Sequence, residues 1–288
     1  MSLSERFRRP PCPPPAEGGV LAALYGGRLS FLLPVISAPI LSRLAGAFLD
    51  SPLSTPLIRG FIRKNNIDMS DYPREKYKSF NAFFTREILP GRRPGRMESD
   101  AHDLISPADS RLTVYPIGGD TSFRIKYGTY SVASLLGGED RAAAFAGGYC
   151  MVFRLSVDDY HRYCFFDSGR MGCRWRIPGR YYTVQPAALR THDYFKENTR
   201  ECCLLETDRF GTAACVEIGA TFVGRSVNRD VRSFARGEEK GRFEFGGSTV
   251  VLLLEKGAAR IDADILENSQ RGLETRVRIG EPGGQALR

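Results

Sequence analysis

Histidine, paired cysteines and long apolar runs are scarce or missing in this sequence, and each scarcity excludes a class of protein. The chain has only three histidines, His102, His161 and His192, and its seven cysteines include no Cys-x-x-Cys pair. It also has none of the zinc-finger spacings or aromatic motifs of nucleic-acid-binding modules. We therefore expect no bound metal and no nucleic-acid partner, and any chemistry that needs an imidazole must use one of three side chains.

The cysteines favour a reducing compartment. Their number is odd, and the first residues do not have the pattern of a secretory signal. We expect reduced thiols that mostly fill the core of a cytosolic protein.

No apolar run reaches the roughly 20 uninterrupted residues that a membrane-spanning helix needs. The best candidate, residues 29–49, contains a single charge, Arg43, but Pro34 and Pro39 interrupt it. Because proline breaks a helix, we expect short helices that lie in the membrane interface rather than a transmembrane helix. A helical layer packed on the rest of the protein is compatible with the same pattern.

Positive charge makes an anionic surface the expected partner. The net charge is +8 and the pI is near 9.2. Arg59, Arg63 and Lys64 lie within or just after a second apolar patch at residues 57–62, where they would add attraction to anionic headgroups. The sequence therefore predicts a peripheral protein on the cytoplasmic side of the cell membrane.

The composition changes near Tyr72-Pro73, which we interpret as a boundary. Residues 1–74 would be an N-terminal tail followed by the helical membrane-associating segment. The proline-rich stretch 8–15 within it should be disordered or extended, because proline supports neither helix nor sheet there. Residues 75–288 would form the main domain.

Short strands separated by Gly, Asp and Asn clusters dominate the main domain, and helical patterns are fewer. The sequence therefore predicts an α+β fold made mostly of antiparallel sheet. The predicted strands are Arg111–Tyr115, Cys150–Leu155, Ala213–Ile218 and Thr249–Leu254, and the predicted helices are Ser79–Ile88, with Ser79 as a possible N-cap, and Ser131–Leu136.

A Gly-Gly-Ser-Thr tetrad at residues 246–249 precedes the last predicted strand. Because glycine has no Cβ, the hydroxyl of Ser248 can attack the carbonyl of Gly247. The resulting ester would eliminate to dehydroalanine, which cuts the chain, and hydrolysis with loss of ammonia would leave a pyruvoyl group at position 248. Such a ketone accepts an amine substrate as a Schiff base and acts as an electron sink. A bare tetrad of this kind is more often only a turn that enters a core strand.

Five stretches together, in this order, resemble the blocks of the phosphatidylserine decarboxylase family. They are residues 79–86, 106–110, 159–163, 219–224 and 243–249. The resemblance implies decarboxylation of phosphatidylserine to phosphatidylethanolamine, a pyruvoyl group made from Ser248, and two chains, 1–247 and 248–288, from one precursor. It implies no metal and no diffusible cofactor.

The chain departs from the best-known form of the family at two places. Many members have a second histidine where this chain has Cys164, and a His-Thr-Val-x-Pro motif where this chain has Tyr182. We interpret the Tyr-His-Arg-Tyr-Cys version, together with Gly-Gly-Ser-Thr, as a natural subgroup. The hydroxyl of Tyr182 would still be able to supply a proton during turnover.

Self-cleavage needs a base for the hydroxyl of Ser248, and His161 is the main candidate because it follows a predicted strand and lies in the family's Tyr-His-Arg block. Asp109 would hold its imidazole in the base tautomer and complete an Asp-His-Ser relay. His192 is the reserve candidate, whereas His102 lies in a polar loop and should be solvated.

Arg86 and Arg200 are the candidates for binding the substrate's carboxylate or phosphate, although structural salt bridges explain each arginine equally well. The alternatives for function are a decarboxylase of another serine-headgroup lipid, such as archaetidylserine, and a non-catalytic membrane-binding relative. A serine hydrolase is disfavoured because the tetrad lacks the final glycine of a Gly-x-Ser-x-Gly elbow. A homodimer is compatible with the sequence.

Overall fold

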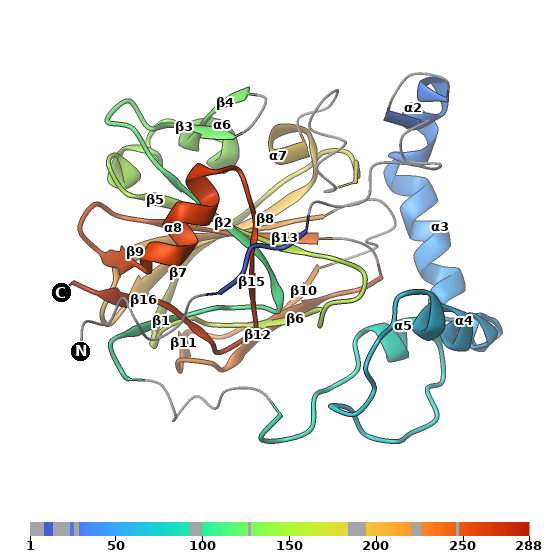
Figure 1. Cartoon of the computed structure of the whole chain (residues 1–288). Coiled ribbons are helices and arrows are strands. Elements are labelled where there is room, and N and C mark those ends of the chain that lie inside the picture. Colours follow the sequence, from blue (N-terminus) through green and yellow to red (C-terminus); the bar gives the residue numbers. More distant parts are fainter. Residues whose placement is uncertain are drawn as a thin grey trace.

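Strand β13 (Ser248–Leu254) lies near the middle of an eight-stranded sheet, and the other layers are arranged around it (Figure 1). The computed structural model describes residues 9–13, 24–25, 29–92, 100–125, 128–183, 194–219, 226–245 and 248–287. The sheet has the order β11-β7-β8-β9-β13-β5-β2-β15, and every pairing in it is antiparallel.

The strands of this sheet differ in length from two residues to nine. They are β2 (Ser110–Pro116), β5 (Tyr149–Leu155), β7 (Gly169–Ile177), β8 (Arg200–Thr207), β9 (Gly211–Ile218), β11 (Ser233–Phe234), β13 and β15 (Thr275–Val277). The four strands predicted from the sequence are confirmed as β2, β5, β9 and β13, which are direct neighbours in the sheet.

Two smaller sheets and a hairpin complete the strand layers, and their pairings are also antiparallel. One sheet contains β10 (Ser226–Asn228), β12 (Glu239–Phe243) and β6 (Arg162–Cys164), another contains β1 (Asp103–Ile105), β16 (Pro282–Ala286) and β14 (Ala259–Ile261), and the hairpin joins β3 (Ser122–Ile125) to β4 (Gly128–Ser131). The predicted α+β fold with mostly antiparallel sheet is confirmed.

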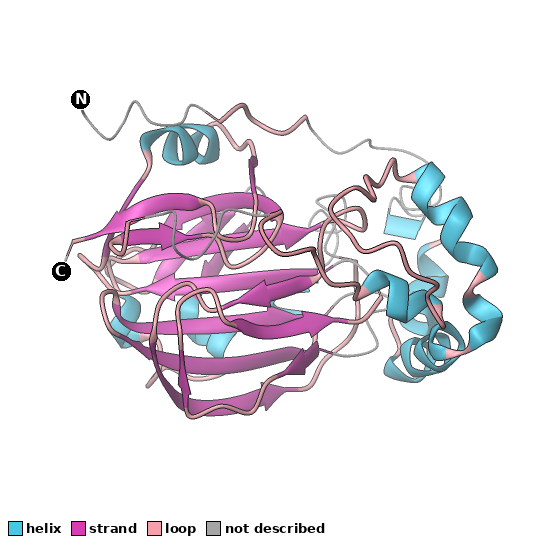
Figure 2. Cartoon of the chain, turned by 90° about the horizontal axis from the view of Figure 1, so that it is seen from below, coloured by secondary structure: helices cyan, strands magenta, loops and turns pink. Residues whose placement is uncertain are grey.

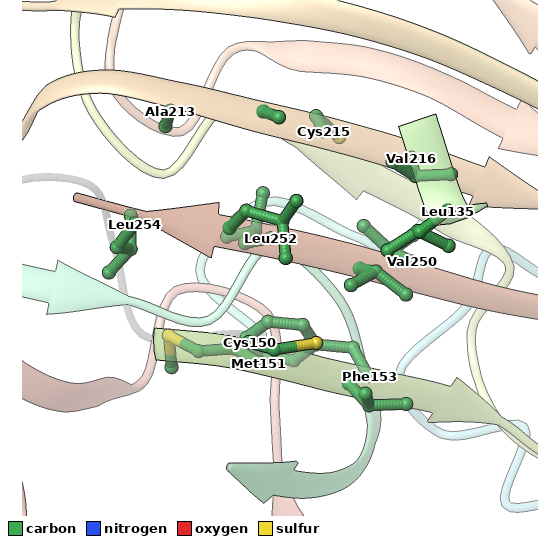
Figure 3. Packing of buried hydrophobic residues seen from close by; sticks show 14 of the residues in the cluster. Leu135, Cys150, Met151, Phe153, Ala213, Cys215, Val216, Val250, Leu252 and Leu254 are labelled. Carbon is green, nitrogen blue, oxygen red and sulfur yellow. The ribbon is translucent and has the colours of Figure 1, made fainter. Parts of the chain in front are cut away.

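Apolar burial and one buried ion pair join the sheets. Every residue of β13 is buried, and Val250, Leu252 and Leu254 pack beside side chains of β5 and β9 (Figure 3). On the face that carries Val250, Glu217 of β9 is ion-paired with Lys240 of β12. Both charges lie out of contact with water, where an unpaired charge would be costly. The pair therefore ties β12 to the large sheet.

The helices are short, and most of them begin at residues that the sequence marks as helix starts. Ser79 and Ser131 accept hydrogen bonds from Ala82 and Ser134 at the beginnings of α5 and α6. The helices are α2 (Leu33–Ile36), α3 (Pro39–Asp50), α4 (Pro56–Lys64), α5 (Phe80–Phe84), α6 (Val132–Leu136), α7 (Tyr194–Glu197) and α8 (Ala263–Gln270), with 3₁₀ turns η2 (Ser30–Leu32), η3 (Pro52–Ser54) and η4 (Ala143–Phe145). Helix α5 ends at Phe84, four residues before the end of the predicted helix Ser79–Ile88.

Helices α2 to α5 gather at one end of the strands (Figure 2). Among the described residues no single helix is long and apolar enough to span a membrane, whereas α2 and α3, bent by 64° around Pro39, reach that length only together. The predicted interruption of the run at its prolines is confirmed, since α2 carries Pro34 in its first turn and α3 begins at Pro39.

The two apolar patches of this segment face in different directions. Seven large hydrophobic side chains of residues 31–57 are exposed. They are Phe31, Val35, Ile40, Leu44, Phe48, Leu53 and Leu57. In contrast, Ile58, Phe61 and Ile62 of the second patch turn inward and pack on Leu49, Phe80, Phe83 and Phe84. The segment thus forms both a layer on the main domain and an apolar face toward solvent.

None of the seven cysteines forms a disulfide, and six of them are buried, whereas Cys173 is exposed. The prediction that the cysteines mostly fill the core is confirmed.

Candidate functional site

Ser248 begins β13 and is completely buried. It pairs with Leu155 of β5, and its neighbour Thr249 pairs with both Arg154 of β5 and Ile218 of β9. The hydroxyl of Ser248 has no hydrogen-bond partner in the part of the chain that the structure describes. A buried hydroxyl without a partner is costly, so this one is held in place by the strand rather than by its own bonds. Gly246 and Gly247 lie outside the described residues.

His161 is completely buried, and its ring has one bonded and one unbonded nitrogen. Its Nδ1 lies 2.9 Å from the carbonyl oxygen of Asp159. Because a carbonyl only accepts, Nδ1 carries the proton and Nε2 keeps a free electron pair. Nε2 has no hydrogen-bond partner among the described residues. The structure therefore presents this imidazole in the tautomer of a base.

Burial keeps the imidazole neutral. It lowers the pKa of His161 to about 3, against the opposing hydrogen bond to Asp159, and the positive charge of Arg86 lowers the pKa further. The ring of Phe84 lies against it with centroids 4.1 Å apart. Helix α5 therefore covers the imidazole with an aromatic side chain.

Segments far apart in the sequence meet around His161. The N–H of Phe243, five residues before Ser248, donates to the carbonyl of His161 at 2.9 Å. Phe84 contacts both His161 and Phe245, whose ring centroid lies 5.1 Å away. Three of the five sequence blocks, 79–86, 159–163 and 243–249, therefore meet around one buried position.

Asp159 fixes the turn that presents His161, and the sequence analysis missed it. Its carboxylate accepts from Arg111 at 2.9 Å, from Arg276 at 3.0 Å and from the N–H of Ser156 at 2.7 Å. Burial raises the pKa of its carboxyl to about 6, and the two arginines oppose that rise. The sequence position of Asp159 indicates this contact, because the main-chain carbonyl of a residue two positions before a histidine can reach its ring nitrogen.

The described residues show no hydrogen bond between Asp109 and His161, so the predicted Asp-His step of the relay is not seen in this structure. Oδ1 of Asp109 accepts from the N–H of Ile279 at 2.8 Å, and Pro107 in the same turn accepts from the N–H of Cys164 at 2.8 Å. The partner of Nδ1 is the carbonyl of Asp159 because the turn before His161 places that group next to the ring. Asp109 therefore holds the turn before β2 rather than the imidazole.

Arg86 is buried next to this group and is incompletely bonded. Its Nη1 donates to the carbonyl of Phe83 at 3.2 Å, and its guanidinium lies over the rings of Tyr72 and Phe83. Its Nε and Nη2 have no partner among the described residues. A buried cation with unused donors has the chemistry to bind an anion.

Arg86 lines a cleft of about 880 Å³ between α5, the preceding segment and the β10-β12-β6 sheet. The lining holds five basic and five acidic side chains. They are Lys78, Arg86, Arg162, Arg229, Arg242, Asp50, Glu75, Glu87, Glu239 and Glu244. Arg162 and Arg229 are paired with glutamates of the same cleft. Equal numbers of both signs suit a zwitterionic ligand better than a simple anion.

The remaining predicted residues lie elsewhere. Arg200 is aligned with Ile218 and Thr249, so its side chain is on the face of the sheet opposite Ser248, where it donates to the carbonyls of Lys196 and Ser134. His102 is exposed, as predicted. His192 lies outside the described residues.

Tyr182 lies at the same end of the sheet as Ser248. Its N–H and carbonyl are bonded to the side chain of Asn198, which also donates to the carbonyl of Gly219 at 2.7 Å. Gly219 directly follows the last residue of β9. Asn198 therefore anchors the segment of Tyr182 to the strand that neighbours β13.

Comparisons with known proteins support the resemblance to one family. The family model described as phosphatidylserine decarboxylase matches residues 80–285. The chain is 42% identical to phosphatidylserine decarboxylase proenzyme 2 of Clostridium acetobutylicum over 93% of this chain and 92% of that protein. It is 38% identical to the phosphatidylserine decarboxylase proenzyme of Ruminiclostridium cellulolyticum, over 94% and 93% of the two chains. It is 41% identical to that of Clostridium perfringens strain SM101, over 88% of each.

The buried neutral His161 predicts how stability depends on pH. In the unfolded chain the pKa of His161 returns to about 6.5. Below that pH the unfolded chain therefore binds a proton that the native chain binds only near pH 3. In an uncut Ser248→Ala background, the free energy of unfolding in urea should therefore fall as the pH drops below about 6.5. His161→Gln should remove up to about 1.4 kcal/mol per pH unit of that slope.

His102→Gln is the matched control, because His102 is exposed and should leave the slope unchanged. Equal slopes in the two glutamine variants would contradict a buried, neutral His161.

Proposed function

The chain belongs to the phosphatidylserine decarboxylase family, and we propose that it converts phosphatidylserine to phosphatidylethanolamine with a pyruvoyl group made from its own Ser248. The observation that carries the proposal is the pair of buried, unbonded atoms, Ser248 Oγ and His161 Nε2. Identities of about 40% to proteins named phosphatidylserine decarboxylase proenzymes favour this substrate over an ether lipid with the same headgroup.

The first reaction is the cut that the residues at the start of β13 would make. His161 Nε2 takes the proton of the Ser248 hydroxyl, and the oxygen attacks the carbonyl carbon of Gly247. The C–N bond breaks as an ester forms, and the freed amine of Ser248 takes a proton. Loss of the α-proton then expels the Gly247 carboxylate and leaves dehydroalanine. Water converts this residue to a pyruvoyl group and ammonia.

The site fits this chemistry because it is dry. Ser248 and His161 are both fully buried, so the neutral imidazole does not compete with water for the hydroxyl proton. Asp159, through its carbonyl, keeps the proton on Nδ1. Asp109 contributes as a positioning residue, since it holds the turn that leads into β2.

A pyruvoyl ketone supplies the electron sink for loss of CO₂ from an amine-bearing substrate. The chain's own residues would then handle protons and charge. His161 or Tyr182 returns a proton to the substrate's α-carbon. Arg86 holds an anionic group of the headgroup in the mixed-charge cleft, which leaves the substrate's single amine to condense with the ketone. Arg200, on the other face of the sheet, has no place in this scheme.

We further propose that the chain binds the cytoplasmic face of the membrane peripherally. Seven of the eight large hydrophobic side chains that are exposed among the described residues lie between residues 31 and 57. Their clustering on α2 to α4 gives an apolar face, and the cations of α4 add attraction to anionic lipid. The cleft with Arg86 also touches Asp50 at the end of α3, so the headgroup site lies beside this face.

Self-cleavage predicts two chains, 1–247 and 248–288, on a denaturing gel. Intact mass should show the smaller chain lacking the elements of ammonia relative to an N-terminal serine. His161→Ala and Ser248→Ala should each give one uncut chain, whereas His102→Ala should be cut normally. Full-length chain alone in an active preparation, or normal cutting of His161→Ala, would refute the role given to the pair.

Arg86→Gln should still be cut but should bind substrate poorly. Losing two charge-assisted hydrogen bonds raises KM about 10- to 100-fold. Arg229→Gln is the control inside the same cleft, because its charge is already near Glu238 and Glu239, and its KM should change little. An unchanged KM in the cut Arg86→Gln protein would exclude headgroup binding by this arginine.

Binding to vesicles should need the apolar face. The Ile40→Glu, Leu44→Glu double variant should lose at least about tenfold in affinity, because two side chains no longer enter the interface. Leu287→Glu alters an exposed leucine outside this segment and should bind normally. Binding should strengthen with anionic lipid and weaken with salt. A protein that resists salt and alkaline carbonate and needs detergent would span the bilayer instead.

A further inference from the structure

We call residues 9–12 the N-terminal strap. Its first residue, Arg9, is buried, and its guanidinium forms four hydrogen bonds. The guanidinium of Arg9 donates twice to the carboxylate of Asp264, at 2.9 and 3.1 Å, and once to Asp262 at 2.6 Å. It also donates to the carbonyl of Pro282 at 2.6 Å. Only 8% of its side chain is exposed. Such a bidentate pair is specific and costly to break.

The main chain of the strap is bonded as well. The N–H of Arg9 donates to Asp264 at 2.9 Å, and the N–H of Cys12 donates to the carbonyl of Glu274 at 2.7 Å. Pro11 forms an isolated antiparallel bridge with Thr275. Prolines at positions 10, 11 and 13 restrict φ, so the strap loses little conformational entropy when it binds. The predicted extended conformation of this stretch is seen over the described residues 9–13.

All of these partners lie after position 248. Apart from β13, the strands of the region 248–287 are joined to the rest of the chain only by two short pairings in the described structure, β15 with β2 and β16 with β1. The strap contacts α8 and the residues that flank both β15 and β16. It therefore adds a further attachment to these pairings and to the bonds that Glu274 makes with Arg154 and Ile279 makes with Asp109.

We propose that the strap is a clasp between the two chains of the mature protein, with Arg9 of the large chain held by Asp262 and Asp264 of the small chain. This inference rests on the proposed cut at 247/248, which turns each of these contacts into an inter-chain contact. The clasp also holds Glu274 and Thr275 beside Arg276, which binds the carboxylate of Asp159. The small chain thereby stays hydrogen-bonded to Asp159, whose carbonyl orients His161.

Retention of the small chain tests the clasp. The cut wild-type protein is diluted stepwise in sub-denaturing urea, and size-exclusion chromatography with a denaturing gel measures how much small chain stays with the large chain. Arg9→Ala should raise the concentration needed for half retention by about 100-fold. Asp264→Asn, a change on the other chain, should act in the same direction.

Arg174→Ala is the matched control, because its ion pair with Asp230 lies within the large chain. It should retain the small chain as the wild type does. If Arg9→Ala and Asp264→Asn, once cut, retain the small chain at wild-type concentrations, the clasp is refuted and the cut stands. A wild-type preparation that stays one chain refutes both the cut and the clasp.

Discussion

The rest of the structure depends on the position of β13, which is hydrogen-bonded on both sides in the middle of the large sheet. A strand in that place cannot shift without breaking two ladders, so its first residue is fixed although the hydroxyl of Ser248 has no partner of its own. Burial also leaves His161 neutral and keeps the hydroxyl of Ser248 out of contact with water. The same position explains how a cut chain can stay folded, since the small chain would keep the central strand.

An aromatic cluster connects helix α4 to this buried position. Phe61 of α4 contacts Phe80 and Phe84 of α5, and Phe84 contacts both His161 and Phe245. Edge-to-face packing of this kind adds to the burial energy and gives the layer a defined geometry. One group of rings therefore covers the imidazole, supports the apolar face of α2 to α4 and borders the cleft of Arg86.

Local patterns in the sequence predicted the elements that local physics controls. The predicted strands became β2, β5, β9 and β13, which are the most continuously apolar segments because the sheet buries both of their faces. Ser79 was recognisable as a cap because the N–H that it accepts from is only three residues away. The polar, half-exposed β7 was missed, since alternating charges hide a strand when the covering layer is unknown. The family, with its decarboxylation chemistry and its Gly-Ser site, came from motifs that need no fold to be recognised.

By itself, then, the sequence determined the fold class, the central strands, the family and the few candidate residues for proton transfer and substrate binding. Only the tertiary structure decided which of them meet. It placed Arg200 on the face of the sheet opposite Ser248, because a one-residue difference in strand position changes the face. It left Arg86 buried near His161, because α5 packs over the imidazole. It placed the carbonyl of Asp159, rather than the side chain of Asp109, within hydrogen-bond distance of Nδ1 of His161. It also joined Arg9 to Asp264, 255 residues away. Such contacts arise from packing distant segments, which no local pattern records.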